Sequence, residues 1–140
     1  MGARLRGAAV GLGVALFAAI GCGQDGPKTY PVNGKVAYKG KGDMIRLSGG
    51  QVIFESVAEP RVTASGEIER DGAFTLGCLV EGKQCVGVPA GEYRVRVKPP
   101  PDEGSERAVH PKYLSADKSG VTVTVTPGTN TPTIEVEAGR

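Results

Sequence analysis

The chain has 140 residues, of which 23% are charged, and its formal net charge is +2. Arg4 and Arg6 account for that excess, so residues 22–140 carry equal numbers of basic and acidic side chains. A neutral domain attracts nucleic acid weakly, because such binding depends on neutralising phosphates. The 22 glycines and 10 prolines exclude long helices.

The N-terminal segment has the order of a secretory signal. Arg4 and Arg6 precede an uncharged apolar run over residues 8–20, which is shorter than the roughly 20 residues needed to span a bilayer. Gly21 and Cys22 follow, and this ending resembles the lipobox of bacterial lipoproteins, although Ala19 stands where that family prefers leucine. The resemblance implies that residues 1–21 are a lipoprotein signal peptide and that Cys22 is the acylated mature N-terminus. An ordinary signal peptide that ends near a cysteine is the alternative.

Removal of the leader leaves 22–140, enough for one domain with a single core. Residues 22–30 are rich in Gly, Asp, Pro and Lys, which predicts a lipidated N-terminus followed by a flexible tether. Residues 31–140 form the expected domain. Gly23 follows the cysteine where an aspartate retains some lipoproteins in the inner membrane, so the outer membrane is favoured over the inner one, with the domain on the periplasmic side.

Alternating apolar residues predict strands along the domain. The expected strands are centred on 32–38, 51–55, 62–68, 74–76, 93–97, 121–125 and 134–136. Arg70-Asp71-Gly72 is typical of a tight turn, which predicts a hairpin from about Val62 to Leu76. Arg94, Arg96 and Lys98 alternate on one strand and are expected to face solvent. Residues 99–119 are expected to form a long polar loop. About seven short strands favour an all-β fold with two packed sheets, a β-sandwich.

Two cysteines remain after Cys22 is assigned to the anchor. Cys78 and Cys85 form an even pair in an exported chain and enclose six residues that can turn back. A bridge between them would close a loop of eight residues, and it is expected to contribute about 2.5 kcal/mol. Two separate thiols on either side of the turn are the alternative. With one histidine in the chain, a zinc site is not expected.

Three segments carry a further resemblance. Residues 87–97, GVPAGEYRVRV, resemble a strand of carboxypeptidase-regulatory-like and transthyretin-like domains, and residues 31–38 and 66–76 resemble the first strand and following hairpin of those domains. Together with the lipobox, the chain is similar to small lipoproteins of planctomycete-type bacteria. The resemblance implies a single Ig-like, transthyretin-like sandwich. It implies no established activity, and the activity of the transthyretin-like hydrolases is not carried over, because the C-terminal tail differs from theirs.

The chemistry-bearing residues are sparse. His110 lies in the 99–119 segment with several serines and carboxylates, and a small hydrolase that uses this loop is one alternative. Asp102, Glu103 and Glu106 are read as a solvated acidic loop rather than a calcium site. Tyr30 and Tyr113 are the candidates for exposed aromatics in a carbohydrate-binding module, the other alternative. No cofactor, metal or nucleic-acid partner is expected.

The leading expectation is therefore a lipid-anchored envelope β-sandwich with a non-enzymatic binding or structural role. It would be held to the membrane through Cys22 and would display a sheet face or the 99–119 segment to other envelope proteins or glycans.

Overall fold

The computed structural model describes residues 28–80 and 82–139. The expected signal peptide 1–21, Cys22 and most of the tether lie outside the described residues. In the described part, no helix has both the length and the apolar character needed to cross a membrane.

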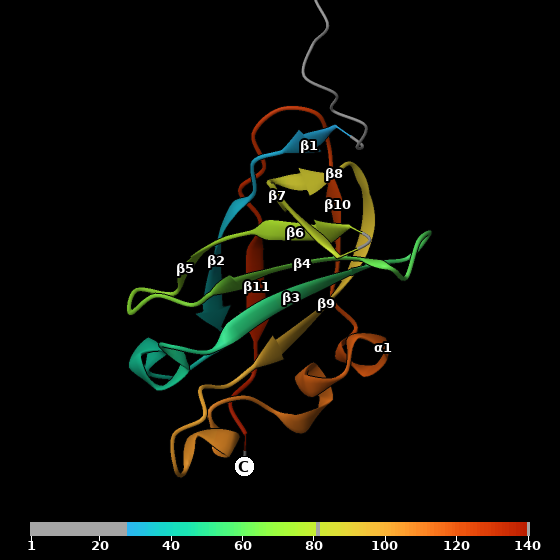
Figure 1. The fold of residues 1–140 in the computed structure, drawn as a ribbon. Helices are drawn as coiled ribbons and strands as arrows, with labels where there is room; N and C mark the ends of the chain where they lie inside the picture. The colour runs from blue at the N-terminus through green and yellow to red at the C-terminus, as the bar shows by residue number, and fades with distance from the viewer. Residues whose placement is uncertain (1–27, 81, 140) are drawn as a thin grey trace, which may run out of the picture.

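The described residues form eleven strands and a few short helical turns (Figure 1). The strands are β1 Thr29–Tyr30, β2 Asn33–Tyr38, β3 Gln51–Ser56, β4 Val62–Glu67, β5 Ala73–Thr75, β6 Gly77–Val80, β7 Lys83–Val86, β8 Val88–Pro89, β9 Gly91–Lys98, β10 Thr122–Val125 and β11 Thr133–Val136. The helical elements are the 3-10 turns η1 Met44–Leu47, η2 Ser105–Arg107 and η3 Pro111–Leu114, and the α-helical turn α1 Ala116–Ser119.

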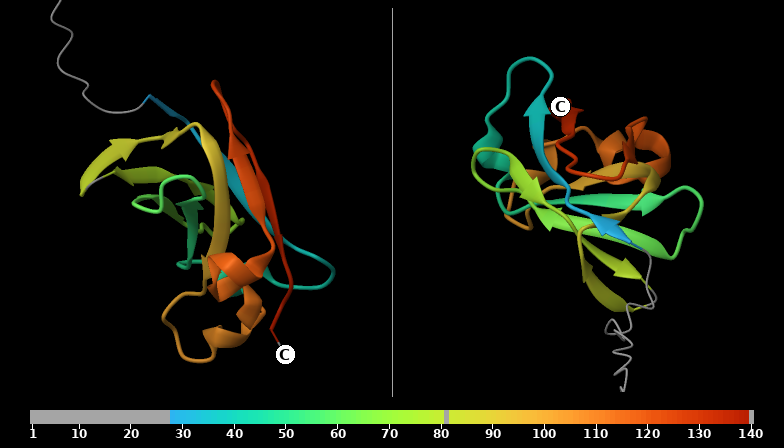
Figure 2. Two further views of the ribbon diagram at one scale, coloured as in Figure 1. Left: turned by 90° about the vertical axis from the view of Figure 1, so that its right-hand side faces the viewer. Right: turned by 90° about the horizontal axis from the view of Figure 1, so that it is seen from above.

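Two sheets face each other, and a two-stranded piece completes one end. The larger sheet has the order β10-β9-β3-β4-β6-β7, the smaller one the order β11-β2-β5, and β1 pairs with β8. In the smaller sheet, β11 runs parallel to β2, with Ile134 opposite Val36. Figure 2 shows the larger sheet and the smaller sheet as separate layers. The predicted all-β sandwich is confirmed.

The core lies between the two layers, and valine is its most frequent residue, as the low aromatic content predicts. Val52, Phe54, Val95 and Val97 of the larger sheet are at most 1% exposed and face Val36, Ile134 and Val136 of the smaller one. Each fully buried side chain of this size contributes about 1.5–3 kcal/mol. The rings of Phe54 and Phe74 meet edge to face, with their centroids 6.4 Å apart.

The predicted hairpin from Val62 to Leu76 is wrong, although its turn is present. Glu69 and Ala73 bond across the turn, and Gly72 has a φ of 91°. Beyond it, β5 pairs with β2 in the opposite sheet, and the free edge of β4 is taken by β6. Gly34, opposite Phe74, permits this pairing: a Cβ at Gly34 would lie 2.3 Å from Phe74 Cζ, so the missing side chain makes room for the ring.

Two further expectations are corrected. Thr29 and Tyr30, at the end of the expected tether, form β1 and pair with Pro89 and Val88. The expected polar loop 99–119 contains three helical turns, and it buries Ala108, Val109 and Tyr113 in the core. Its apolar residues close the end of the sandwich, which a purely polar loop would leave open to water.

Candidate binding surface

The outer face of the larger sheet is set by strand alternation. Because Val62 and Ala64 of β4 point into the core, Thr63 and Ser65 point outward. Thr63 lies opposite Leu79, which lies opposite Gln84. Ser65 lies opposite Gly77 in the next row, which ends at Val86 on the edge strand β7.

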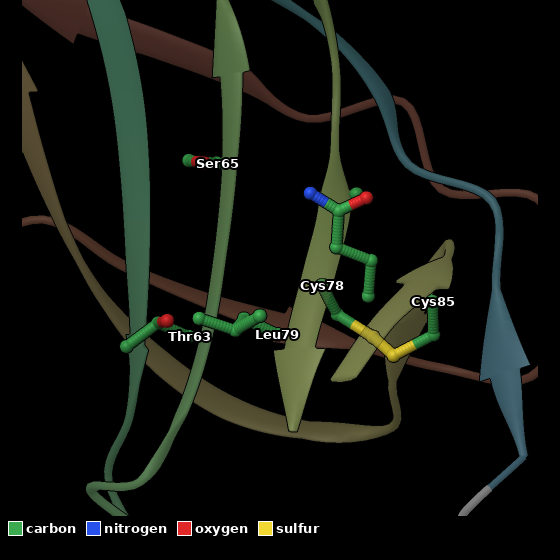
Figure 3. Close-up of a pocket in the computed structure, with 7 residues that line it drawn as sticks. Thr63, Ser65, Cys78, Leu79 and Cys85 are labelled. Atoms are coloured by element: carbon green, nitrogen blue, oxygen red, sulfur yellow. A yellow bond between two sulfur atoms is a disulfide. The ribbon is translucent and has the colours of Figure 1, made fainter. Parts of the chain in front are cut away.

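This part of the face is hollowed. A shallow depression of about 370 Å³ is lined by Thr63, Ser65, Gly77, Cys78, Leu79, Gln84 and Cys85. Figure 3 shows Thr63 and Leu79 beside each other and the cysteine pair at the opposite side of the depression. Gly77, on the middle strand β6, has no side chain to fill the space. The lining therefore offers hydroxyl and amide groups next to apolar surface, a mixture suited to recognition of a partner.

The disulfide holds the edge of this surface together. Cys78 and Cys85 lie directly opposite on β6 and β7, with their Cα atoms 5.0 Å apart, and the structure joins their sulfurs. Cys78 is 3% exposed, so the bridge lies on the core side of the hairpin. The covalent link restrains a strand of four residues at the sheet edge, where a short hairpin alone is marginally stable.

Exposed apolar side chains gather on the same hairpin. Val86 is 91% exposed and Leu79 is 43% exposed.

The rest of the outer face carries ion pairs. Ile53 is 9% exposed and lies opposite Arg96, which pairs with Glu55 at 3.2 Å. Arg94 pairs with Asp117 at 2.8 Å. These exposed ion pairs stabilise the fold little, and they leave the β6–β7 end as the more apolar part of the face.

The β6–β7 surface was not among the residues that sequence reasoning singled out for binding. Its pattern is nevertheless present in the sequence: Gly77–Val80 and Lys83–Val86 are separated by two residues, Glu81 and Gly82, which is typical of a hairpin. The cysteines on either side of that turn indicate the same pairing.

His110 serves a structural purpose in the 99–119 segment. Its Nδ1 accepts a hydrogen bond from the backbone nitrogen of Lys112 at 3.1 Å and thereby caps η3. Its own backbone nitrogen donates to the carbonyl of Glu137 at 2.8 Å. The hydroxyl of Ser119 donates to the carbonyl of Val95 at 2.5 Å, and that of Ser105 donates to the carbonyl of Asp102 at 2.6 Å. The two serines are therefore engaged with the backbone rather than with the imidazole.

An exposed ion pair ties the same segment to the C-terminal strand. Lys112 Nζ lies 3.2 Å from Glu137 Oε2. The hydrogen bond between them raises the pKa of Lys112 and lowers the pKa of Glu137. Asp102, Glu103 and Glu106 lie on the surface, and in the described ranges no group of three or more His, Cys, Asp or Glu side chains is placed to hold a metal ion.

The prediction that Tyr113 is a candidate for an exposed, sugar-binding aromatic is wrong. Its side chain is 1% exposed and belongs to the core, because η3 turns it inward beneath β9. Tyr30, the other candidate, is half-buried in β1 and packs against the core. A flat ring must be accessible to stack on a sugar, so neither tyrosine forms the expected platform.

Comparison with known proteins shows no family for this chain. No protein-family model matches the chain, and no curated protein matches it. The chain is similar to the crystal structure of a DUF3823 family protein from Parabacteroides merdae, with 19% sequence identity and a TM-score of 0.48. The alignment covers 81% of this chain and 48% of that protein, so the chain spans about half of its length.

Proposed function

We propose that this chain is a lipid-anchored protein of a bacterial cell envelope, with a non-enzymatic binding or structural role. In this proposal Cys22 carries the lipid, and the sandwich binds another envelope component through the outer face of its larger sheet. The resemblance to small lipoproteins of planctomycete-type bacteria supports the anchor, as does the basic, apolar and small-residue order of residues 1–22.

Anchoring through several acyl chains is physically sufficient. Each buried methylene contributes about 0.8 kcal/mol, and one chain alone binds only marginally, whereas two or more give stable anchoring. The bridge between Cys78 and Cys85 supports the same location, because disulfides persist in oxidising compartments outside the cytosol. Gly23 after the anchor residue supports the outer membrane and the periplasmic side.

The observation that carries the binding role is the depression beside the disulfide. Leu79 and Gln84 stand at its rim, and both are exposed while the neighbouring core is closed. In the 99–119 segment, by contrast, Ala108, Val109 and Tyr113 are buried in the core. The outer face of β4, β6 and β7 is therefore the surface on which a partner gains apolar contact and hydrogen bonds together.

A site-specific photo-crosslinker tests this role in intact cells. A benzoylphenylalanine at Gln84 is expected to yield a discrete adduct, and one at exposed Lys118 is the matched control that yields none. The blocking variant is Gly77→Val: a Cβ at Gly77 meets its nearest neighbour, the carbonyl oxygen of Cys85, at an ordinary 3.5 Å, so the larger side chain fits and fills the depression.

The adduct at Gln84 is expected to disappear in the Gly77→Val protein, while the amount and membrane fraction of the protein stay the same. Equal adducts from Gln84 and Lys118, or an adduct that survives the filling of the depression, would contradict a binding role for this surface.

A further inference from the structure

We propose that the end of the domain formed by β1, β7 and β8 rests on the surface of the lipid bilayer, with Val86 at the boundary between headgroups and acyl chains. This inference rests on the proposed lipid anchor at Cys22. It adds the orientation of the domain and names a second surface with a lipid partner.

Little chain lies between the proposed anchor and the fold. Five residues, 23–27, separate Cys22 from Lys28, where the described structure begins. The six steps from Cys22 to Lys28 span at most about 20 Å even when fully extended. Because an acylated Cys22 lies at the bilayer, the start of β1 stays within that distance of the membrane, and the end of the domain that holds β1 faces it.

An exposed apolar side chain, Val86, lies beside β1. The hydroxyl of Thr29 donates to the carbonyl of Val86 at 2.6 Å, and Tyr30 pairs with Val88. Val86 is therefore fixed next to the first residue of the fold. Its 91% exposure exceeds the 61% of Ile45, the next most exposed large apolar residue among those described. An apolar side chain this exposed at the anchored end is suited to the interface of a bilayer.

This end also carries positive charge. Lys28, which directly precedes β1, and Lys83, which begins β7, are both exposed. A lysine close to an anionic membrane surface contributes about 1 kcal/mol of attraction.

The opposite end of the molecule supplies the internal control. β2 has six residues, and at about 3.3 Å per residue it spans about 20 Å. It begins beside β1 and ends at Tyr38, whose hydroxyl donates to the carbonyl of Ala108 at 2.5 Å. The helical turns η2, η3 and α1 lie at this far end together with the C-terminus (Figure 1). Leu114, which ends η3, is 45% exposed and should face away from the membrane.

Tryptophan fluorescence tests the orientation directly, because the chain contains no tryptophan. Val86→Trp and Leu114→Trp each introduce one reporter at an exposed apolar position, so both variants are expected to fold. Each variant is isolated from cell envelopes in its processed form. It is then reconstituted into vesicles of phosphatidylglycerol and brominated phosphatidylcholine. Flotation of the vesicles and the intact mass of the protein establish whether Cys22 is acylated and the protein is bound.

We expect the emission of Val86→Trp to be quenched at least twofold by brominated lipid and that of Leu114→Trp to remain unchanged. Equal emission from the two reporters in protein that floats with the vesicles would overturn the orientation and leave the anchor standing. Protein with an unmodified Cys22 that does not float would overturn the anchor, and the orientation with it. Quenching of Leu114→Trp alone would show that the end with η2, η3 and α1 contacts the membrane, and it would overturn the proposed orientation.

Discussion

At the scale of single residues, Tyr93 shows how one side chain joins packing to hydrogen bonding. Its ring lies 5.8 Å from that of Phe54, and its hydroxyl donates to the carbonyl of Pro89 at 2.6 Å. Burial of the phenol, with a smaller contribution from Glu59, raises its pKa to about 12. The folded protein therefore holds the hydroxyl in its neutral, donating form.

The Tyr93→Phe variant should lose this hydrogen bond and keep the ring. We expect a loss of about 1–3 kcal/mol in the free energy of unfolding at neutral pH, because the carbonyl of Pro89 is left without this donor. The stabilisation that follows from the raised pKa is fully present below the ordinary value of 10.0 and is lost as pH rises through about 12. Urea unfolding at neutral and at alkaline pH measures both effects.

The parent protein should therefore lose stability above pH 10.0, and the Tyr93→Phe variant should lose less over the same range. Tyr38, whose pKa is also raised mainly by burial, leaves some slope in the variant. An unchanged slope in Tyr93→Phe would show that the hydroxyl does not titrate as described.

Residue patterns predicted the buried positions of β2, β9 and β11 well, because each of these strands has one face in the core. Tyr93, Val95 and Val97 alternate with charged residues and are buried as expected. Tyr113 could not be placed in this way. It stands in a polar segment without a strand period, and its burial comes from η3 folding back on β9, a contact between distant parts of the chain.

At the scale of elements, sequence patterns located the turn at Gly72 but not the partner of β5. Local alternation gives the same pattern whether Phe74 faces β4 or β2. The actual pairing involves distant parts of the chain: Gly34 of β2 leaves room for the ring of Phe74, and β6 occupies the edge of β4. The candidate surface was missed for a related reason, because β6 and β7 were treated as the two sides of a loop.

The disulfide is predicted to stabilise the β6–β7 hairpin more than the rest of the fold. Replacing both cysteines, as Cys78→Ala with Cys85→Ala, removes a loop closure worth about 2.5 kcal/mol. We expect a loss of up to about that amount in unfolding free energy, and faster hydrogen exchange at the amides of β7 than at those of β3. The intact mass of the parent should rise by about 2 Da on reduction, which serves as the control.

A double variant that unfolds at the same urea concentration as the parent, with unchanged exchange in β7, would mean that the bridge does not hold the edge strand. A parent mass that does not change on reduction would mean that the two sulfurs are not joined in the isolated protein.

At the scale of the whole molecule, the proposals assign different parts of the sandwich to different partners. In these proposals the end with β1, β7 and β8 lies next to the anchor, and the depression on the outer face adjoins that end through β7. A partner that reaches the depression is thus expected near the membrane surface. The far end, with η2, η3 and α1, closes the core and points away.

The central claim is the lipid anchor, since the compartment, the orientation and the class of partner all depend on it. The most direct measurement is the intact mass and N-terminal fragmentation of the protein isolated from its own cells. We predict a chain that begins at Cys22, lacks residues 1–21 and carries fatty acyl groups on that cysteine. A chain that begins at Met1, with Cys22 unmodified and the protein recovered from the cytosol, would contradict the account.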